Sequence, residues 1–276
     1  MRFVPVIVTR AVATAVLLAA LAFASPAGAV VGGTDDLGNR YESVGVLQLD
    51  ADGEWFDFCS GTLVAENVVL TAAHCVDFFT ADVGEDGLGT DDLRISFDPD
   101  PDETSTYYFV EEIVIHPDWA SRPQGRGNSK HLYLAPPAED IALVFLTQDV
   151  ADVEPSAVAD AEYFDGIDIT AETFTVVGYG TDEYITGSAM SAKPVTVFDG
   201  IRSYRDVSVI TLHDAFPDRF LKITAGVCFG DSGGPLFHED TVVALNSWTF
   251  SMRCAGPNLE YRLDSSAAQA FLNGYL

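Results

Sequence analysis

The sequence predicts an all-β protein built as a sandwich or as barrels. Short runs of β-branched and aromatic residues recur along the chain, and Gly, Pro or Asp interrupts them. An apolar repeat with helical spacing is almost absent before residue 265. Many short strands with few helices between them are typical of antiparallel sandwiches and barrels.

Six runs are the clearest strand candidates, and each is short and bounded by turn-forming residues. They are residues 44–49, 68–70, 107–110, 141–146, 174–177 and 242–245. Only the end of the chain, residues 265–276, reads as a helix, with Asp264 or Ser265 as its N-cap. We find no internal repeat.

Residues 1–29 predict a secretory signal peptide. Arg2 and Arg10 flank a short positive region, residues 11–24 are an apolar run, and Ala-Gly-Ala at 27–29 offers a small-x-small cleavage site. A membrane anchor is the less favoured alternative, because a spanning helix needs about 20 apolar residues. We therefore expect a secreted protein that starts at Val30 and does not associate with a membrane after cleavage.

The mature chain is strongly acidic. The full sequence has 14 Lys and Arg against 42 Asp and Glu, a net charge of −28; loss of Arg2 and Arg10 changes this to 12 against 42, or −30. Such a charge excludes nucleic acid as a partner, since the phosphates would be repelled. It also loads the folded state with self-repulsion, which salt screens.

Four cysteines remain in the mature chain, at positions 59, 75, 228 and 254. An even number in an exported protein predicts disulfides, with three possible pairings. A zinc site near His74 is the less favoured alternative, because paired-cysteine spacing and a second nearby histidine are both missing. We expect no metal there.

A glycine-rich segment presents one serine. Gly230, Gly233 and Gly234 surround Ser232 and let the backbone turn tightly. A serine hydroxyl becomes a good nucleophile only when a neighbouring base removes its proton. The chain offers a candidate base in Leu-Thr-Ala-Ala-His-Cys at 70–75 and a candidate acid at the head of an apolar run, in Glu-Asp-Ile-Ala-Leu at 139–143.

The order His74, Asp140, Ser232, each within its own block, resembles the chymotrypsin/trypsin family of serine endopeptidases. Further blocks at residues 30–33, 59–63, 177–180 and 247–248 resemble the family as well, so the likeness spans nearly the whole chain after residue 29. The resemblance implies two six-stranded antiparallel β-barrels with the active site between them and a C-terminal helix. We expect residues 30–152 to form the N-terminal barrel, with His74 and Asp140, and residues 153–276 the C-terminal barrel, with Ser232.

The resemblance also implies the chemistry. Ser232 would attack the peptide carbonyl, His74 would take and return the proton, and Asp140 would orient the imidazole. The backbone N–H groups of Gly230 and Ser232 would form the oxyanion hole. The amino group of Val30, released by signal cleavage, would pair with Asp231.

The family likeness places the substrate-binding residues. Gly226 would form the base of the primary pocket, with Val227 beside it, so the acid that makes trypsin prefer Arg or Lys is missing. Ser247 would hydrogen-bond the catalytic aspartate, and Trp248 would begin the strand that pairs with substrate. Thr249 stands where the family often has glycine, which favours a small or medium apolar residue before the cut. If Glu260 turned inward, a basic residue would be the alternative.

Several further features follow from the same likeness. It selects the pairs Cys59 with Cys75 and Cys228 with Cys254, and the lack of a third disulfide near residues 220–225 suggests a bacterial type. Residues 77–112 hold twelve acids, and the corresponding loop sometimes binds calcium in the family; the missing EF-hand spacing favours a solvated loop and no cofactor. By the same likeness the loop at 121–137 would overhang the cleft, but an ordinary variable insertion is the favoured alternative.

The sequence thus predicts a secreted, monomeric serine endopeptidase acting on polypeptides. Two alternatives stay open. One is a catalytically silent binding protein on the same fold, and the other is a narrow-substrate esterase or regulatory protease with a crowded pocket.

Overall fold

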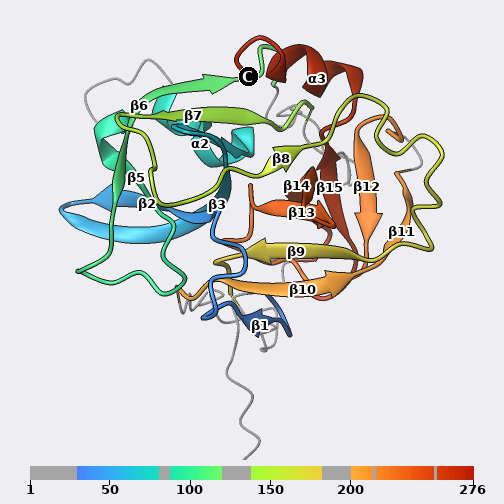
Figure 1. Cartoon of the computed structure of the whole chain (residues 1–276), viewed down its shortest axis with the longest axis horizontal. Helices are drawn as coiled ribbons and strands as arrows, with labels where there is room; N and C mark the ends of the chain where they lie inside the picture. Colours follow the sequence, from blue (N-terminus) through green and yellow to red (C-terminus); the bar gives the residue numbers. More distant parts are fainter. Residues whose placement is uncertain (1–29, 81–87, 120–137, 182–199, 214–215, 252–253) are drawn as a thin grey trace, which may run out of the picture.

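The computed structural model describes residues 30–80, 88–119, 138–181, 200–213, 216–251 and 254–276. The predicted signal peptide, the loop at 121–137 and residues 81–87 of the acidic loop lie outside the described residues. Figure 1 shows the described chain as two β-rich halves.

The first half is a closed antiparallel barrel, as predicted. Its strands follow the order β2-β3-β4-β7-β6-β5. Alternate side chains point inward and form one apolar core, which includes Leu47, Val69, Ile95 and Val144. The strands are β2 (Val44–Ala51), β3 (Glu54–Ala65), β4 (Val68–Thr71), β5 (Leu93–Ser96), β6 (Tyr108–Ile115) and β7 (Ala142–Leu146).

In the described residues, the second half contains nine strands rather than the expected six. The described residues form one sheet with the order β1-β10-β9-β13-β14-β15-β12-β11, and β8 adds to β14 in parallel. The strands are β1 (Thr34–Asp35), β8 (Ala157–Val158), β9 (Phe174–Gly178), β10 (Ser203–Val207), β11 (Val209–Leu212), β12 (Phe220–Ile223), β13 (Pro235–His238), β14 (Thr241–Thr249) and β15 (Asn258–Arg262). The all-β class is confirmed, and the domain boundary at 152/153 stays a prediction.

The predicted strand runs all overlap observed strands, in β2, β4, β6, β7, β9 and β14. The terminal helix is confirmed as α3 (Ser266–Leu272), and Ser265 is its cap, since its hydroxyl accepts from the Ala268 N–H at 3.3 Å. The expectation of no other helix was wrong, because α2 (Ala73–Thr80) follows β4 and a short 3₁₀ turn, η1 (Thr90–Asp92), precedes β5. Within the described ranges, no helix is long and apolar enough to cross a membrane.

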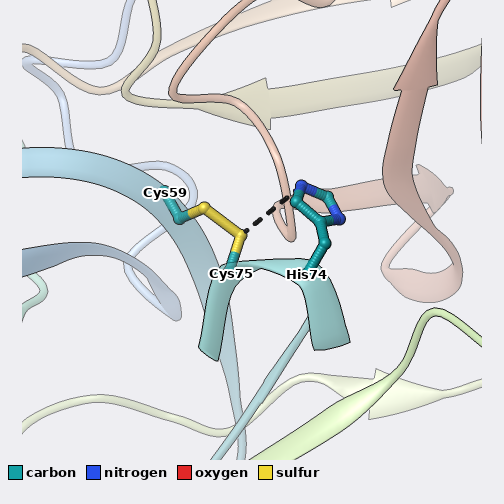
Figure 2. Close-up of side chains that lie close together, drawn as sticks. All are labelled: Cys59, His74 and Cys75. Carbon is teal, nitrogen blue, oxygen red and sulfur yellow. Dashed lines mark hydrogen bonds between the residues drawn. A yellow bond between two sulfur atoms is a disulfide. The ribbon is translucent and has the colours of Figure 1, made fainter. Parts of the chain in front are cut away.

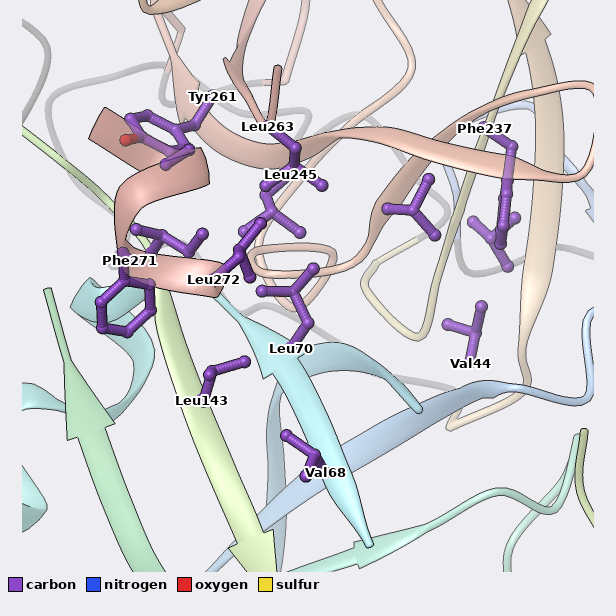
Figure 3. Packing of buried hydrophobic residues seen from close by; sticks show 14 of the residues in the cluster. Val44, Val68, Leu70, Leu143, Phe237, Leu245, Tyr261, Leu263, Phe271 and Leu272 are labelled. Carbon is purple, nitrogen blue, oxygen red and sulfur yellow. The ribbon is translucent and has the colours of Figure 1, made fainter. Parts of the chain in front are cut away.

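A shared hydrophobic core joins the two halves. Val44, Leu70 and Leu143 come from the barrel, while Leu245 and Tyr261 come from the second sheet. Figure 3 shows these side chains meeting between the strands, with Phe271 and Leu272 of α3 packed beside them. Residues of the two halves are therefore held in fixed relative positions close to this core.

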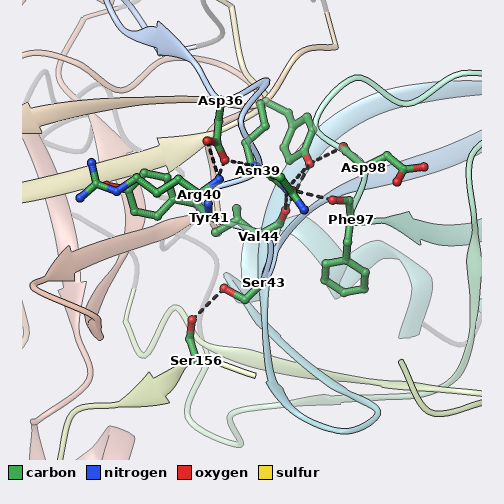
Figure 4. A network of polar contacts seen from close by, with 11 residues as sticks. Asp36, Asn39, Arg40, Tyr41, Ser43, Val44, Phe97, Asp98 and Ser156 are labelled. Carbon is green, nitrogen blue, oxygen red and sulfur yellow. Dashed lines mark hydrogen bonds and ion pairs between the residues drawn. The ribbon is translucent and has the colours of Figure 1, made fainter. Parts of the chain in front are cut away.

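A buried polar network also crosses between the halves. Arg202 is completely buried, and its guanidinium binds Asp36 at 2.9 Å and the carbonyl oxygens of Val44 and Phe97 at 2.9 Å each, as well as the side chain of Asn39. Figure 4 shows this network around Asp36, Asn39 and Val44. Because removing one partner of a buried ion pair costs about 3–5 kcal/mol, the segment after Val30 is anchored firmly.

Candidate active site

His74 lies in the first turn of α2, and Asp140 lies just before β7 of the same barrel. The imidazole Nδ1 is 2.8 Å from Asp140 Oδ2, and Asp140 Oδ1 accepts the backbone N–H of His74 at 3.0 Å. Asp140 is completely buried. Since a carboxylate only accepts, Nδ1 carries the hydrogen and Nε2 is the basic nitrogen.

A second donor reaches Asp140 from the other half. Ser247, near the end of β14, donates its hydroxyl to Asp140 Oδ2 at 2.6 Å, and Ser247 is itself buried. The acid is therefore held by both halves of the fold.

The environment of His74 raises the pKa of its imidazole above the ordinary value. Burial alone would lower the pKa, because a charged ring loses hydration. The negative charge of Asp140, the hydrogen bond to it and the charge of Asp77 outweigh burial. The site thus favours the imidazolium that forms when the ring accepts a proton.

Ser232 lies beside the histidine loop. Its carbonyl oxygen accepts from the Ser60 N–H at 2.8 Å and lies 3.5 Å from Cys75 Sγ. The same sulfur is 3.8 Å from His74 Nε2 (Figure 2), so the basic nitrogen and the Ser232 carbonyl oxygen both lie close to Cys75. Over the described chain, no hydrogen bond joins the Ser232 hydroxyl to His74. The structure brings all three predicted triad residues to one place.

Near Ser232, the backbone N–H groups of Gly230 and Ser232 have no acceptor among the described residues, and neither does that of Phe229. Gly230 has φ +95°, and its carbonyl is fixed by the Ser60 hydroxyl at 2.9 Å. Gly233 has φ +78°, and a Cβ there would lie 2.1 Å from Thr71 Oγ1, so only glycine fits. This turn leaves two neighbouring donors available to an anion.

Asp231 is completely buried below the serine turn. Its carboxylate accepts from the N–H groups of Gly180 at 2.9 Å and Cys228 at 2.8 Å. The side-chain amide of Asn246 donates to the Asp231 carbonyl at 3.0 Å. The residue before Ser232 is therefore held both by its side chain and by its backbone carbonyl.

Val30 is also buried close to this place. In the full-length chain its nitrogen belongs to a peptide bond and donates to Ser203 Oγ at 2.7 Å. Ser203 pairs with Gly178, where a Cβ would lie 2.3 Å from Asp231 Oδ1. The predicted pair of Val30 with Asp231 needs a free amino group and stays a prediction; Ser203, which accepts from Val30, pairs across the strands with Gly178, which lies beside Asp231.

Both disulfides are confirmed: Cys59 with Cys75 and Cys228 with Cys254. Cys59, Cys75 and His74 offer atoms within 4.8 Å of one another, a spacing compatible with a metal ion (Figure 2). A disulfide has no thiolate to offer a metal, so the bond between the two sulfurs accounts for this cluster. The predictions of no metal and of no bound calcium remain predictions.

The predicted pocket residues lie around one strand end. Gly226 and Val227 are buried, and the side chain of Asn258 accepts from the Val227 N–H at 3.5 Å and donates to the Val227 carbonyl at 3.1 Å. Thr249 and Trp248 are half-buried at the end of β14. Thr249 pairs with Asn258 across the strands, and Asn258 in turn binds Val227, so the three residues lie close together.

Glu260 is turned inward. It is completely buried, and neither carboxyl oxygen has a hydrogen-bond partner within the described residues. Burial raises the pKa of Glu260 well above its ordinary value, and the charge of Asp231 raises it further. The site therefore disfavours the charged form of the carboxyl group unless a cation approaches it.

Sequence reasoning missed the residues that support the site. Ser60, Asn246 and Asn258 are buried polar residues on strands, and their partners lie far away in the sequence. Their polar character within apolar runs is the one sequence signal they carry.

Residues 30–266 match the family model described as Trypsin. The chain belongs to the trypsin family. Trypsin-family relatives include chymotrypsin-like elastase family member 1 of Macaca fascicularis, 37% identical over 124 residues that cover 44% of this chain and 39% of the relative. The rat protein of the same name is 28% identical over 82% of this chain and 80% of its own length.

A chymotrypsin-like serine proteinase of Haliotis rufescens is 26% identical over 90% of this chain and 92% of its own length. The chain spans about two fifths of the elastases of Macaca fascicularis and Canis lupus familiaris that it matches. These trypsin-family relatives are animal proteins, so the bacterial type is not confirmed.

Proposed function

We propose that the protein is a secreted serine endopeptidase that hydrolyses polypeptides through an acyl-enzyme. One observation carries the proposal: the buried Asp140 binds Nδ1 of His74, which leaves Nε2 as the basic nitrogen, 3.8 Å from Cys75 Sγ, and the Ser232 carbonyl oxygen lies 3.5 Å from the same sulfur. In this proposal Ser232 is the nucleophile, His74 the base, and the N–H groups of Gly230 and Ser232 the anion site.

The first step forms the acyl-enzyme. The Ser232 hydroxyl attacks the peptide carbonyl while His74 Nε2 takes its proton. The oxygen that becomes negative accepts from the N–H groups of Gly230 and Ser232, and each such donor lowers the barrier by about 3 kcal/mol. His74 then gives the proton to the leaving amine. In the second step His74 takes a proton from water, the water oxygen attacks the acyl carbonyl, and the proton returns to the Ser232 oxygen as the acyl group leaves.

Asp140 keeps the imidazole in place through these steps. Its carboxylate accepts from the ring, from the His74 backbone and from Ser247, so it cannot rotate freely. It fixes the tautomer with hydrogen on Nδ1 and stabilises the imidazolium by its charge.

Activation follows from signal cleavage. A cut after Ala29 releases the Val30 amino group, which would pair with the buried Asp231 and fix the serine turn. Signal peptidase would then make the activating cut. Amino-terminal sequencing of secreted protein tests this step: the expected start is Val30, and a stable inactive precursor or another start contradicts it.

The pocket favours a small or medium apolar residue before the cut. Thr249 would narrow the pocket beside Val227, and Thr249 is the cross-strand neighbour of Asn258, which binds the Val227 backbone. Several relatives are named chymotrypsin-like elastase. A basic residue is the second candidate, because Glu260 is buried without a partner and would gain from a cation.

The proposed protein acts outside the cell on polypeptides, as a monomer and without a cofactor. The predicted signal peptide and the two disulfides support export. The catalytically silent binding protein is disfavoured because all three triad residues are present. The narrow-substrate esterase or regulatory protease would use the same triad and would differ from the proposed endopeptidase only in its range of substrates.

A peptide library tests the proposal. Mature protein and a Ser232→Ala variant are incubated with peptides that differ at the residue before the cut. We expect cleavage after Ala, Val or Leu by the wild type and none by the variant. Cleavage by Ser232→Ala contradicts the mechanism, and hydrolysis of esters alone supports the narrow esterase.

A further inference from the structure

The residue directly before Asp140 has an unusual backbone. Glu139 has φ +49°, in the left-handed region, and its carbonyl accepts from the Ile141 N–H at 2.9 Å. Glutamate rarely adopts this conformation, because its Cβ crowds the backbone. The tight turn that aims Asp140 therefore needs contacts that hold it.

Those contacts come from the second half of the fold. The Tyr261 hydroxyl donates to Glu139 Oε2 at 2.5 Å, a short bond to a charged acceptor. The guanidinium of Arg219 lies 3.7 Å from Oε1, and the Glu139 side chain is only 13% exposed. Both oxygens of this carboxylate thus face groups from outside the barrel.

The donor itself is rigidly placed. Tyr261 is completely buried on β15, between Leu245 of β14 and Phe220 of β12 in the sheet register. Its ring packs edge-on against Phe220 at 5.8 Å and belongs to the core shared with Leu143. Burial and then the bond to Glu139 raise the pKa of the Tyr261 hydroxyl, so it stays a donor in alkaline solution.

We propose that Glu139 is a positioning residue for the triad: Tyr261 and Arg219 grip its carboxylate and thereby fix the turn that aims Asp140 at His74. The inference rests on the proposed endopeptidase function. Asp140 then has two restraints from the second half, one from Ser247 on its carboxylate and one through its neighbour Glu139.

The contacts of Tyr261 and Arg219 with Glu139 affect the triad through the position of Asp140 rather than through the charge of Glu139. The groups that raise the pKa of His74 are Asp140 and Asp77, and Glu139 is not among them. A glutamine at 139 keeps an oxygen that accepts from Tyr261, so it should preserve the turn. Alanine removes the grip but leaves the backbone strained, and glycine removes the grip while it permits the left-handed φ.

Steady-state kinetics of mature Tyr261→Phe, Glu139→Ala, Glu139→Gly and Glu139→Gln test the proposal. We expect kcat to fall about tenfold in the first three with KM unchanged, since a small misplacement slows the chemical step more than binding. Glu139→Gln should stay within about twofold of wild type. The acid limb of kcat/KM should move to lower pH in the first three, because a displaced Asp140 no longer raises the pKa of His74 fully.

Tyr163→Phe is the matched control, because its hydroxyl contacts His238 at 3.0 Å, away from the triad. It should lose similar stability with kcat unchanged. Wild-type kcat in Tyr261→Phe, or restored kcat in Glu139→Gly, overturns the inference while the function stands. If Tyr261→Phe does not fold, equal kcat in Glu139→Ala and Glu139→Gln overturns it. A wild type without hydrolytic activity overturns the proposed function instead.

Discussion

Ser247 Oγ donates to Asp140 Oδ2 at 2.6 Å across the two halves of the fold. Asp140 comes from the barrel and Ser247 from the second sheet, so the acid of the proposed triad bridges both. The oxygen that Ser247 contacts is the one that also binds His74 Nδ1. The bond therefore controls where the imidazole can point.

Replacing Ser247 with alanine should lower kcat about tenfold. A hydrogen bond to a charged group contributes about 1.5–3 kcal/mol, and tenfold in rate corresponds to about 1.4 kcal/mol. KM should change less than kcat, as measured with the best peptide of the library. Ser156→Ala, which removes the bond to Ser43 at 2.7 Å, is the control and should keep its kcat. Equal kcat in Ser247→Ala and wild type would contradict this role.

The pH profile should reflect the raised pKa of His74. Activity should rise with pH through a midpoint above 6.5, the ordinary imidazole value, because the base must be neutral. Asp77→Asn should move this midpoint to lower pH, since one of the charges that raise the pKa is lost. Asp91→Asn, an exposed acid, makes the same change in net charge and should leave the midpoint in place.

The raised pKa of His74 also makes the stability of the folded state depend on pH. A pKa raised on folding means that His74 stabilises the folded state below pH about 6.5 and that this contribution disappears as pH rises through the folded pKa. Melting temperatures of wild type and Asp77→Asn should differ more at pH 6 than at pH 9. A difference that grows with pH would contradict the assignment.

Glu260→Gln should stabilise the protein at neutral pH. The pKa of Glu260 is raised on folding, so the folded state loses stability as pH rises above 4.5, the ordinary value. An amide avoids the charge and can donate to Asn246 Oδ1, which lies opposite on β14 and has no hydrogen-bond partner in the described part of the chain. We expect a gain of about 1–3 kcal/mol at pH 7 that shrinks toward pH 4.5.

Exposed Glu54→Gln serves as the control for Glu260→Gln and should change the melting temperature little at either pH. A Glu260→Gln variant that is less stable at pH 7 than wild type would show that the carboxylate has a cationic partner in the mature protein.

Salt should stabilise the mature chain. Its net charge is −30, which follows from −28 and the loss of two arginines, so its acidic side chains repel one another. Salt shortens the screening length of this repulsion from about 30 Å at 0.01 M to about 3 Å at 1 M. Melting temperature should therefore rise with NaCl over this range. A flat or falling curve would count against the argument.

Much of the fold was predictable because the strands carry local patterns. The runs at 44–49 and 242–245 read as strands from composition alone, and both lie in strands of the structure. Helix α2 was missed because eight residues give too few turns for a periodic signal. The helix is instead held by tertiary contacts: Val76 and Phe79 pack into the barrel core, and Cys75 forms a disulfide with Cys59.

The supporting residues of the site could not be predicted for a different reason. Tyr261 and Glu139 are 122 positions apart, and nothing local in either segment indicates the other. The inward orientation of Glu260 depends on the register of β15, where a slip of one residue would send it to the opposite face. The triad was predictable because each member lies in a distinctive local block.

Covalent labelling of the mature protein by a fluorophosphonate probe, followed by mass spectrometry of the digested adduct, tests the central claim most directly. The account predicts one adduct, on Ser232, that forms far more slowly in His74→Ala and disappears in Ser232→Ala. An unlabelled Ser232 in correctly processed protein, or labelling at the same rate in His74→Ala, would contradict it.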